Sequence, residues 1–584
     1  MSLLTRVVLS GALFAIAAAG LPSEADACGG MFCDLSPPSG TPTAVEQTGE
    51  TIVFVVGGGF VEAHVQIAYD ADDDARVLSW IVPVPAVPEI DVGSAQLLEN
   101  LLLATVPVYG FETEDAVCDE ASEDGGDVMF LLAPDGAGGG GGPVVLVEAT
   151  VGAFDYVVLE GGTSQSVMGW LSSNGYADND KAPAILDAYL DEGAVFVAFR
   201  LTAEAGVDDI HPIVIRYPGH EPCIPLRLTG IAAAPDMSIR ALVLGEARAF
   251  PVNYRHVQLN RVRLDWEDDA SNYTKLVTGA VDEAGGRAFV TEYAGPSSVV
   301  GDQGLHGGDA LGAVALEQLS ATEAIVALRE HGILVCTSTC QYNHPLIAGL
   351  LARYIPVPRG VTGEAFYACV ECYENLVDEE AWDPVAFAAD VRERIVQPAT
   401  HALELLEQWP YLTRLYTTIS PHEMLSDPVF AEVPDLPDVP RAHGALRSED
   451  CCGLSMRLPG GRGVRYEDGA WPRWNAAMPW AERVSEYQAE GPPTEILNQT
   501  ATIDALVAEH NTRVSCDQPP GTTGGEPGAT TTTTGGTGGS SGSGTSANSD
   551  TTTSDCACSS ERSRPTAWAI ALLGILVMAA RRRR

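Results

Sequence analysis

The sequence predicts an α+β fold with mostly antiparallel sheets, interspersed helices and disulfide bonds. Runs rich in β-branched residues gather near the N-terminus, at residues 51–56, 64–69, 77–82 and 144–147, with turn residues between them. Helical patterns follow at irregular intervals, without the βαβ rhythm of a doubly wound parallel sheet. The 13 cysteines suggest a disulfide framework if the chain is exported.

Five segments have a helical pattern bounded by capping or stop residues. They are 94–103, beginning at Ser94; 166–174, capped by Ser166; 181–191, ahead of a strand at 195–201; 322–330, stopped by Gly332 ahead of a strand at 333–336; and 385–407. We expect the last helix to kink at Pro398, because proline lacks a backbone N–H and clashes with the preceding turn.

The N-terminus has the features of a cleaved secretion signal. Arg6 precedes an apolar run over residues 7–19, and small residues lead up to a junction after Ala27. Cleavage there would leave Cys28 at the start of the mature chain. Acylation of Cys28 is the alternative, although the residues before it lack the pattern of a lipobox.

The C-terminus has three adjoining parts. Residues 517–555 are rich in Gly, Thr and Ser and cannot bury a core, so we expect a flexible stalk. Two cysteines, an apolar run at 566–580 and four arginines follow: Cys556, Cys558, Arg581, Arg582, Arg583 and Arg584. As a helix the run would be about 22 Å long, short for a hydrocarbon core of about 30 Å. The arginines would keep the chain end cytoplasmic.

Residues 556–584 closely resemble the MYXO-CTERM sorting domain of myxobacterial surface proteins. The resemblance implies export through the secretion machinery and modification of Cys556 or Cys558. It also implies removal of the helix by a sorting protease, after transient anchoring in the inner membrane, and display at the cell surface on the outer membrane. A plain C-terminal transmembrane anchor is the alternative.

The charge of the chain excludes one class of partner. The net charge is −46; because residues 1–27 carry −1 and residues 556–584 carry +5, the segment between them carries about −50. Such a surface repels nucleic acid and anionic lipid and keeps the protein soluble. We therefore expect no nucleic-acid partner, and the ligand stays unknown.

The cysteines allow two interpretations. Without Cys556 and Cys558 eleven remain, so one must be free, lipidated or intermolecular. Disulfide candidates are Cys28, Cys33, Cys336, Cys340, Cys369 and Cys372, with Cys336 expected to pair with Cys340 or with the 369/372 pair. Zinc binding by Cys336, Cys340, His344, Cys369 and Cys372 is the alternative, although thiolates seldom stay reduced outside the cytoplasm.

Several segments resemble the domain-of-unknown-function family 2330. The most specific is the run from Trp80 to Pro85, WIVPVP, followed by Pro88; the start at Ala27–Cys33 also matches. Further matches are 151–155, 170–176, 225–228 and 411–416, and together the segments are more specific than any one alone. The resemblance covers most of residues 27–420 and implies an envelope location but no activity.

The same proline run has a structural meaning. Proline cannot donate to a strand ladder, so we expect Pro83–Pro88 at a sheet edge or just past a strand end, with Trp80 more buried than its neighbours. A flat platform for sugars or proline-rich chains is the alternative.

The predicted organisation is a signal peptide at 1–27, an ectodomain at 28–445 with room for two subdomains, and a cysteine-containing part at 446–516. A stalk at 517–555 and a sorting signal at 556–584 complete the chain.

No catalytic motif has the surroundings that its chemistry needs. Gly538–Gly542 fits a serine-hydrolase elbow but lies in the stalk; Gly136–Gly141 fits a dinucleotide-binding loop but no helix follows. Asp70, Asp72 and Asp74 begin a calcium loop that lacks its glycine and its final glutamate.

We therefore expect no catalytic residue and no cofactor. The leading interpretation is a non-enzymatic surface protein with a binding or envelope role. The alternative is a secreted hydrolase whose residues meet only in the fold. A buried cluster of titratable groups in a deep pocket would favour the hydrolase, and an exposed apolar patch would favour binding.

Overall fold

The computed structural model describes residues 47–69, 79–114, 143–174, 181–202, 209–307, 311, 314–337, 339–450, 453–467, 469–489 and 491–514. The signal peptide, the stalk and the sorting signal lie outside the described residues, and so do Cys28 and Cys33. The Asp70–Asp74 and Gly136–Gly141 motifs do too. Among the described residues, no helix combines the length and apolar character needed to cross a membrane.

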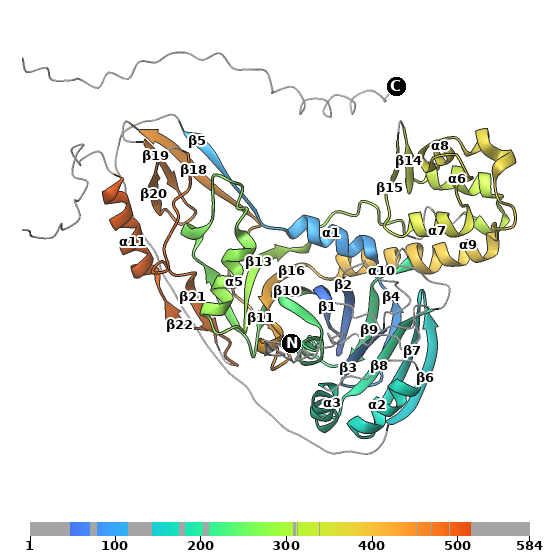
Figure 1. The fold of residues 1–584 in the computed structure, drawn as a ribbon, viewed down its shortest axis with the longest axis horizontal. Coiled ribbons are helices and arrows are strands. Elements are labelled where there is room, and N and C mark those ends of the chain that lie inside the picture. Colours follow the sequence, from blue (N-terminus) through green and yellow to red (C-terminus); the bar gives the residue numbers. More distant parts are fainter. Residues whose placement is uncertain are drawn as a thin grey trace, which may run out of the picture.

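The predicted α+β class is confirmed. A ten-stranded mixed sheet runs through the molecule in the order β22-β21-β12-β13-β16-β10-β1-β2-β9-β4 (Figure 1). Its pairs are antiparallel except β1 with β10 and β12 with β13. Its strands are β1 (Gln47–Gly57), β2 (Phe60–Tyr69), β4 (Glu89–Val92), β9 (Ile213–Pro218), β10 (Ala233–Gly245), β12 (Arg255–Leu259), β13 (Ala288–Pro296), β16 (Tyr411–Ile419), β21 (Ala481–Glu486) and β22 (Thr494–Asn498).

A four-stranded antiparallel sheet, ordered β3-β8-β7-β6, packs on one face of the large sheet. Ile52 and Phe54 of β1 meet Trp80, Val82 and Phe199 in this layer. Helices α2 and α3 cover its outer face, and a short helix α4 follows β9. The elements are β3 (Ser79–Val84), β6 (Pro143–Val151), β7 (Phe154–Gly161), β8 (Val195–Leu201), α2 (Ser164–Ser173), α3 (Ala182–Asp191) and α4 (Leu226–Thr229).

The proline run lies where proline is tolerated. Strand β3 is an edge strand; Pro83 pairs with Phe196 of β8, and Pro85 lies just past the strand end. The expectation for Trp80 is wrong: Trp80 is 8% exposed, whereas Ile81 is 1% exposed. Both faces of β3 are covered, because Trp80 stacks on Phe199 in one layer and Ile81 contacts the helices in the other. Trp80 is therefore no flat platform.

Helices α1 (Ala95–Thr105) and α10 (Gln397–Gln408) lie on the opposite face of the large sheet (Figure 1). Ser94 caps α1 as expected, accepting a hydrogen bond from the Leu97 N–H. The long predicted helix begins as α9 (Pro384–Val391), passes through a π-helical turn at Arg392–Val396 and continues as α10. This turn lies just before Pro398. The wider π-helical turn moves the preceding backbone carbonyl away from the proline ring, with which it would otherwise clash.

A helical module stands at one end of the molecule (Figure 1). Helix α6 begins after Ser320, which forms a capping box with Glu323. The module contains α6 (Ala321–Glu330), β14 (Leu334–Cys336), β15 (Cys340–Tyr342), α7 (Ile347–Tyr354), α8 (Gly363–Ala368) and α9.

A third sheet, ordered β20-β19-β18-β5, stands at the other end with helices α5 and α11 (Figure 1). Strands β11 and β17 form a separate two-stranded sheet. The elements are β5 (Val108–Glu114), β11 (Ala249–Pro251), α5 (Tyr273–Glu283), β17 (Phe430–Glu432), β18 (Ala442–Asp450), β19 (Gly453–Arg457), β20 (Gly463–Tyr466) and α11 (Thr500–Arg513).

One predicted cap is wrong. Thr163, not Ser166, is the N-cap of α2, and Ser166 is its N3 partner in a capping box. Both residues can accept a backbone N–H, so the sequence alone did not separate the two roles.

Candidate functional site

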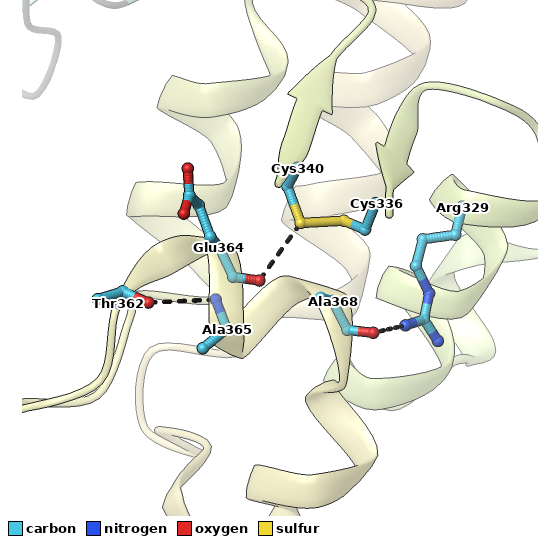
Figure 2. The surroundings of a disulfide bond; sticks show 7 residues. All are labelled: Arg329, Cys336, Cys340, Thr362, Glu364, Ala365 and Ala368. Atoms are coloured by element: carbon cyan, nitrogen blue, oxygen red, sulfur yellow. Dashed lines mark hydrogen bonds between the residues drawn. A yellow bond between two sulfur atoms is a disulfide. The ribbon is translucent and has the colours of Figure 1, made fainter. Parts of the chain in front are cut away.

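Four of the predicted disulfide candidates form two disulfides in the helical module. Cys336 bonds to Cys340 across the β14–β15 hairpin, and Cys369 bonds to Cys372 after α8. Cys340 Sγ lies 3.4 Å from the Glu364 carbonyl oxygen, and this contact joins the hairpin to α8 (Figure 2). Arg329 donates to the Ala368 carbonyl on the same helix.

The zinc site considered as the alternative would need thiolate ligands. None of these four cysteines offers one, because their sulfurs are joined in two disulfide bonds. His344 is buried in a different role: its Nδ1 accepts the Leu346 N–H at 3.2 Å. Burial lowers its pKa to about 3, so it is neutral.

A cavity of about 660 Å³ lies between the β12–β13 end of the large sheet and the third sheet. Strands β5, β11, β12, β13, β18, β21 and β22, helix α5 and the loop 435–440 contribute its walls. This volume lies within the range of pockets that hold small organic ligands.

Arg248 is the most unusual residue of the cavity wall. It is 7% exposed, and its Nη1 and Nη2 donate to the Pro437 carbonyl at 2.7 Å and to Thr291 Oγ1 at 3.0 Å. Its Nε has no hydrogen-bond partner, and no carboxylate of the described chain forms an ion pair with it. Burial lowers its pKa, and the electrostatic effects of Tyr411 and Asp438 oppose that shift. Arg248 is thus a desolvated cation whose hydrogen-bond partners are neutral.

Arg261 lines the same cavity. It is half-buried, and the described part of the chain gives it no ion pair or hydrogen bond of its side chain. A third arginine of the wall, Arg483, is 3.4 Å from Glu495. Two guanidinium groups therefore line this cavity without an ion pair to a described carboxylate, although Asp435 and Asp438 also belong to its wall.

Aromatic side chains form another part of the wall. Tyr109 stacks on His443 with ring centroids 4.9 Å apart and lies 5.6 Å from Tyr273. Burial raises the pKa of Tyr109 to about 12 and that of Tyr273 well above its usual value, and burial lowers the pKa of His443 to about 4. These rings are uncharged at neutral pH and give this part of the wall an aromatic surface.

His256 and Thr291 meet in the cavity, where His256 Nε2 lies 2.8 Å from Thr291 Oγ1. Burial, followed by the nearby Arg248, lowers the pKa of His256 to about 3. Among the described residues no third group binds its other ring nitrogen. A general base works best with a pKa near the working pH, so this pair is a poor catalytic dyad.

Beneath the cavity lies a second buried arginine with complete compensation. Arg414 of β16 is 5% exposed and pairs with Glu292 of β13 at 2.5 Å. It also donates to the Leu102 carbonyl at 3.0 Å and to Thr105 Oγ1 at 3.3 Å, both on α1. Glu292 accepts in addition from the Tyr273 hydroxyl at 2.8 Å.

A second cavity, of about 720 Å³, lies beside the proline run and contains Cys223, the free cysteine of the described chain. Burial raises the pKa of this thiol, so it stays protonated and unreactive. Arg227 in its wall is paired with both Glu192 and Asp427. The guanidinium charge in the wall of the second cavity is therefore compensated by carboxylates, unlike that of Arg248 in the first cavity.

None of the cavity residues was a predicted site residue. Their partners are remote in sequence: Arg248 lies 43 positions from Thr291 and 189 from Pro437. Composition offered only a weak signal, namely arginines in a strongly acidic chain.

Comparison with known proteins supports the family resemblance. No curated protein and no solved structure matches the chain. Residues 22–306 match the family described as "Uncharacterized protein conserved in bacteria (DUF2330)", so this segment, just under half of the chain, carries the family's sequence pattern, and residues 307–420, which we expected to share it, lie outside the match.

Proposed function

We propose that this chain is an exported, surface-anchored binding protein, whose ectodomain takes up a small organic anion with a sugar or aromatic ring. The ligand enters the cavity lined by Arg248, Arg261 and Tyr109, and its carboxylate or phosphate faces the two arginines.

Arg248 carries this proposal. Removing a guanidinium from water costs several kcal/mol unless an opposite charge compensates. Arg248 has two neutral acceptors and an unpartnered Nε. A carboxylate or phosphate would supply the missing charge through charge-assisted hydrogen bonds.

The ring of the ligand follows from the aromatic wall. Tyr109 and His443 already stack on each other, and both are uncharged at neutral pH. An aromatic face contributes contact area to a sugar or planar ring at a small entropic cost.

Several observations support export. The two disulfides of the helical module suit an oxidising compartment, and the acidic surface suits a soluble, displayed domain. The N-terminus, with its basic residue and apolar run, has the features of an export signal, and the C-terminus, with its cysteines, apolar run and arginines, has those of a sorting signal.

A secreted hydrolase is the rival, because His256 and Thr291 are within hydrogen-bond reach. The pKa values of the cavity argue against it: His256 and His443 are too weakly basic, and both tyrosines too weakly acidic, for proton transfer near pH 7. Turnover of a nitrophenyl ester or glycoside that is abolished by Thr291→Val would reverse this preference.

The binding test compares charged and neutral probes by thermal unfolding of the purified protein. Glucuronate and glucose 6-phosphate should raise the unfolding temperature, and glucose at the same concentration should not. A ligand at about 100 times its Kd adds about 2.7 kcal/mol to the free energy of unfolding.

Arg248→Met should abolish the shift, and Arg240→Met is the matched control. Arg240 of β10 is a half-buried arginine whose guanidinium lies over the Tyr416 ring, and it does not line the cavity. Equal shifts with glucose, or an undiminished shift in Arg248→Met, would contradict the proposal.

The anchoring test replaces Cys556 and Cys558 with serine. The variant should accumulate as a longer precursor in the inner membrane and disappear from the cell surface, because the thiol is the acylatable group at that junction. Surface protein whose intact mass still includes Arg581–Arg584 would restore the plain transmembrane anchor.

A further inference from the structure

A separate cluster of ionisable side chains lies between the large sheet and helix α10. Glu62 and His64 are two residues apart on β2, so their side chains point to the same face of the sheet. That face is covered by α10, which contributes His401. Among the described residues, these three form the group of histidine, cysteine, aspartate or glutamate side chains whose potential metal-binding atoms lie within 4.8 Å of one another.

The three side chains converge on one oxygen. Glu62 Oε1 is 2.8 Å from His64 Nε2 and 2.6 Å from His401 Nε2, and the two imidazole rings lie nearly parallel with centroids 6.0 Å apart. The Nε2 atoms of both histidines therefore point toward the same carboxylate oxygen.

The exposed fraction of the side chains increases from one end of the cluster to the other. The side chain of His64 is 1% exposed, that of Glu62 is 11% exposed and that of His401 is 41% exposed. The cluster is therefore closed on the sheet side and open on the helix side, where water could occupy a further position.

The buried end is incompletely satisfied. His64 Nδ1 is buried without a hydrogen-bond partner, so Glu62 is the polar partner that holds this ring. Next to the open end, Glu404 Oε2 lies 3.9 Å from His401 Nδ1. Carboxylates beside the outer ring nitrogen commonly orient metal-binding histidines.

We propose that Glu62, His64 and His401 bind a divalent transition-metal ion of the Zn²⁺ class, which cross-links β2 to α10. Two imidazole nitrogens and one carboxylate oxygen form a donor set that Zn²⁺ accepts, with the fourth position left to water on the open side. Hydrogen bonding alone would also hold the three groups together, and the experiment separates the two arrangements.

The test measures metal content and metal-induced stabilisation. Purified full-length protein is stripped with a chelator, incubated with Zn²⁺, and desalted in the presence of excess Mg²⁺, which occupies surface carboxylates in preference to imidazoles. We expect about one Zn²⁺ retained per chain and a higher unfolding temperature, since the ion binds the folded state more tightly than the unfolded chain.

His401→Gln is the decisive variant, because this half-exposed residue can be replaced without opening the core. It should reduce Zn²⁺ affinity at least tenfold, as should Glu62→Gln. His422→Gln, at an exposed histidine away from the cluster, is the control and should retain the ion.

Co²⁺ provides a second readout that does not depend on any variant. Visible absorption typical of four-coordinate Co²⁺ in the wild-type protein is the expected result. Stoichiometric Zn²⁺ binding that survives His401→Gln, no retained Zn²⁺, or only six-coordinate Co²⁺ would overturn the proposal.

Discussion

Two buried arginines, one on β16 and one directly before β11, distinguish the floor of the cavity from its wall. Arg414 in the floor is 5% exposed and Arg248 in the wall is 7% exposed, so solvent contact does not distinguish them. Their partners do. Arg414 has a carboxylate and two oxygens of α1, whereas Arg248 has a carbonyl and a hydroxyl.

The contrast separates a structural charge from a binding charge. A buried charge that is fully compensated holds elements together, here β13, β16 and α1. A buried charge left with neutral partners weakens the unliganded fold, and an anion can offset that cost. Two predictions test this distinction, and a third concerns a buried base elsewhere in the fold.

The largest effect is expected for Arg414→Met. The substitution leaves Glu292, whose side chain is 2% exposed, as an uncompensated buried carboxylate. Removing one partner of a buried pair typically costs about 3–5 kcal/mol of unfolding free energy. Urea unfolding monitored by circular dichroism measures the loss.

The double variant Arg414→Met with Glu292→Gln is the control for this interpretation. It removes both charges and should be more stable than Arg414→Met alone. Equal stabilities would mean that packing of the arginine, not its charge, holds the floor.

A smaller effect is expected from a buried base that remains uncharged. His211 is 2% exposed, and burial lowers its pKa to about 4. Its Nε2 accepts the Ala153 N–H at 3.0 Å, a bond that a protonated ring could not accept. Below its unfolded pKa of about 6.5 the unfolded chain takes up a proton that the folded chain refuses.

The free energy of unfolding should therefore fall as the pH drops from about 6.5 to about 4, by up to about 1.4 kcal/mol per pH unit from this residue. His211→Gln should flatten the slope by that amount in urea titrations at pH 7.5 and 5. A slope unchanged by the substitution would show that His211 is protonated in the folded state.

The smallest effect on stability is expected for Arg248→Met. Lost hydrogen bonds to Pro437 and Thr291 cost about 1 kcal/mol each, and relief of the desolvated charge offsets them. The unfolding free energy should change by less than about 1 kcal/mol. A loss as large as that of Arg414→Met would place both arginines in the structural class.

Local chemistry made much of the fold predictable. The strand at 195–201 and the helix start at Ser94 agree with the structure, because β-branched alternation and a serine cap act within a few residues. Pro398 marked the irregular turn, since its missing N–H is a local property. Cys336 and Cys340 lie close in the chain, and their pairing was one of the two expected for Cys336; a bond between Cys369 and Cys372 was not predicted.

The candidate sites depend on sheet order, which local patterns do not reveal. Glu62 and His401 are 339 positions apart and meet only because α10 returns across β2. Arg248 meets loop 435–440 through the same kind of long return. The alternating Glu62 and His64 in a β-run was the one local signal, and without His401 it indicates nothing about a metal.

The central claim is that Arg248 recognises the charge of a ligand. The most direct measurement is an isothermal titration cycle: glucuronate and its neutral amide, each with wild-type protein and with Arg248→Met. We predict a coupling between ligand charge and Arg248 of about 1.5–3 kcal/mol, the range for hydrogen bonds to charged groups. A coupling near zero, or no binding of glucuronate or of glucose 6-phosphate in its place, would contradict the account.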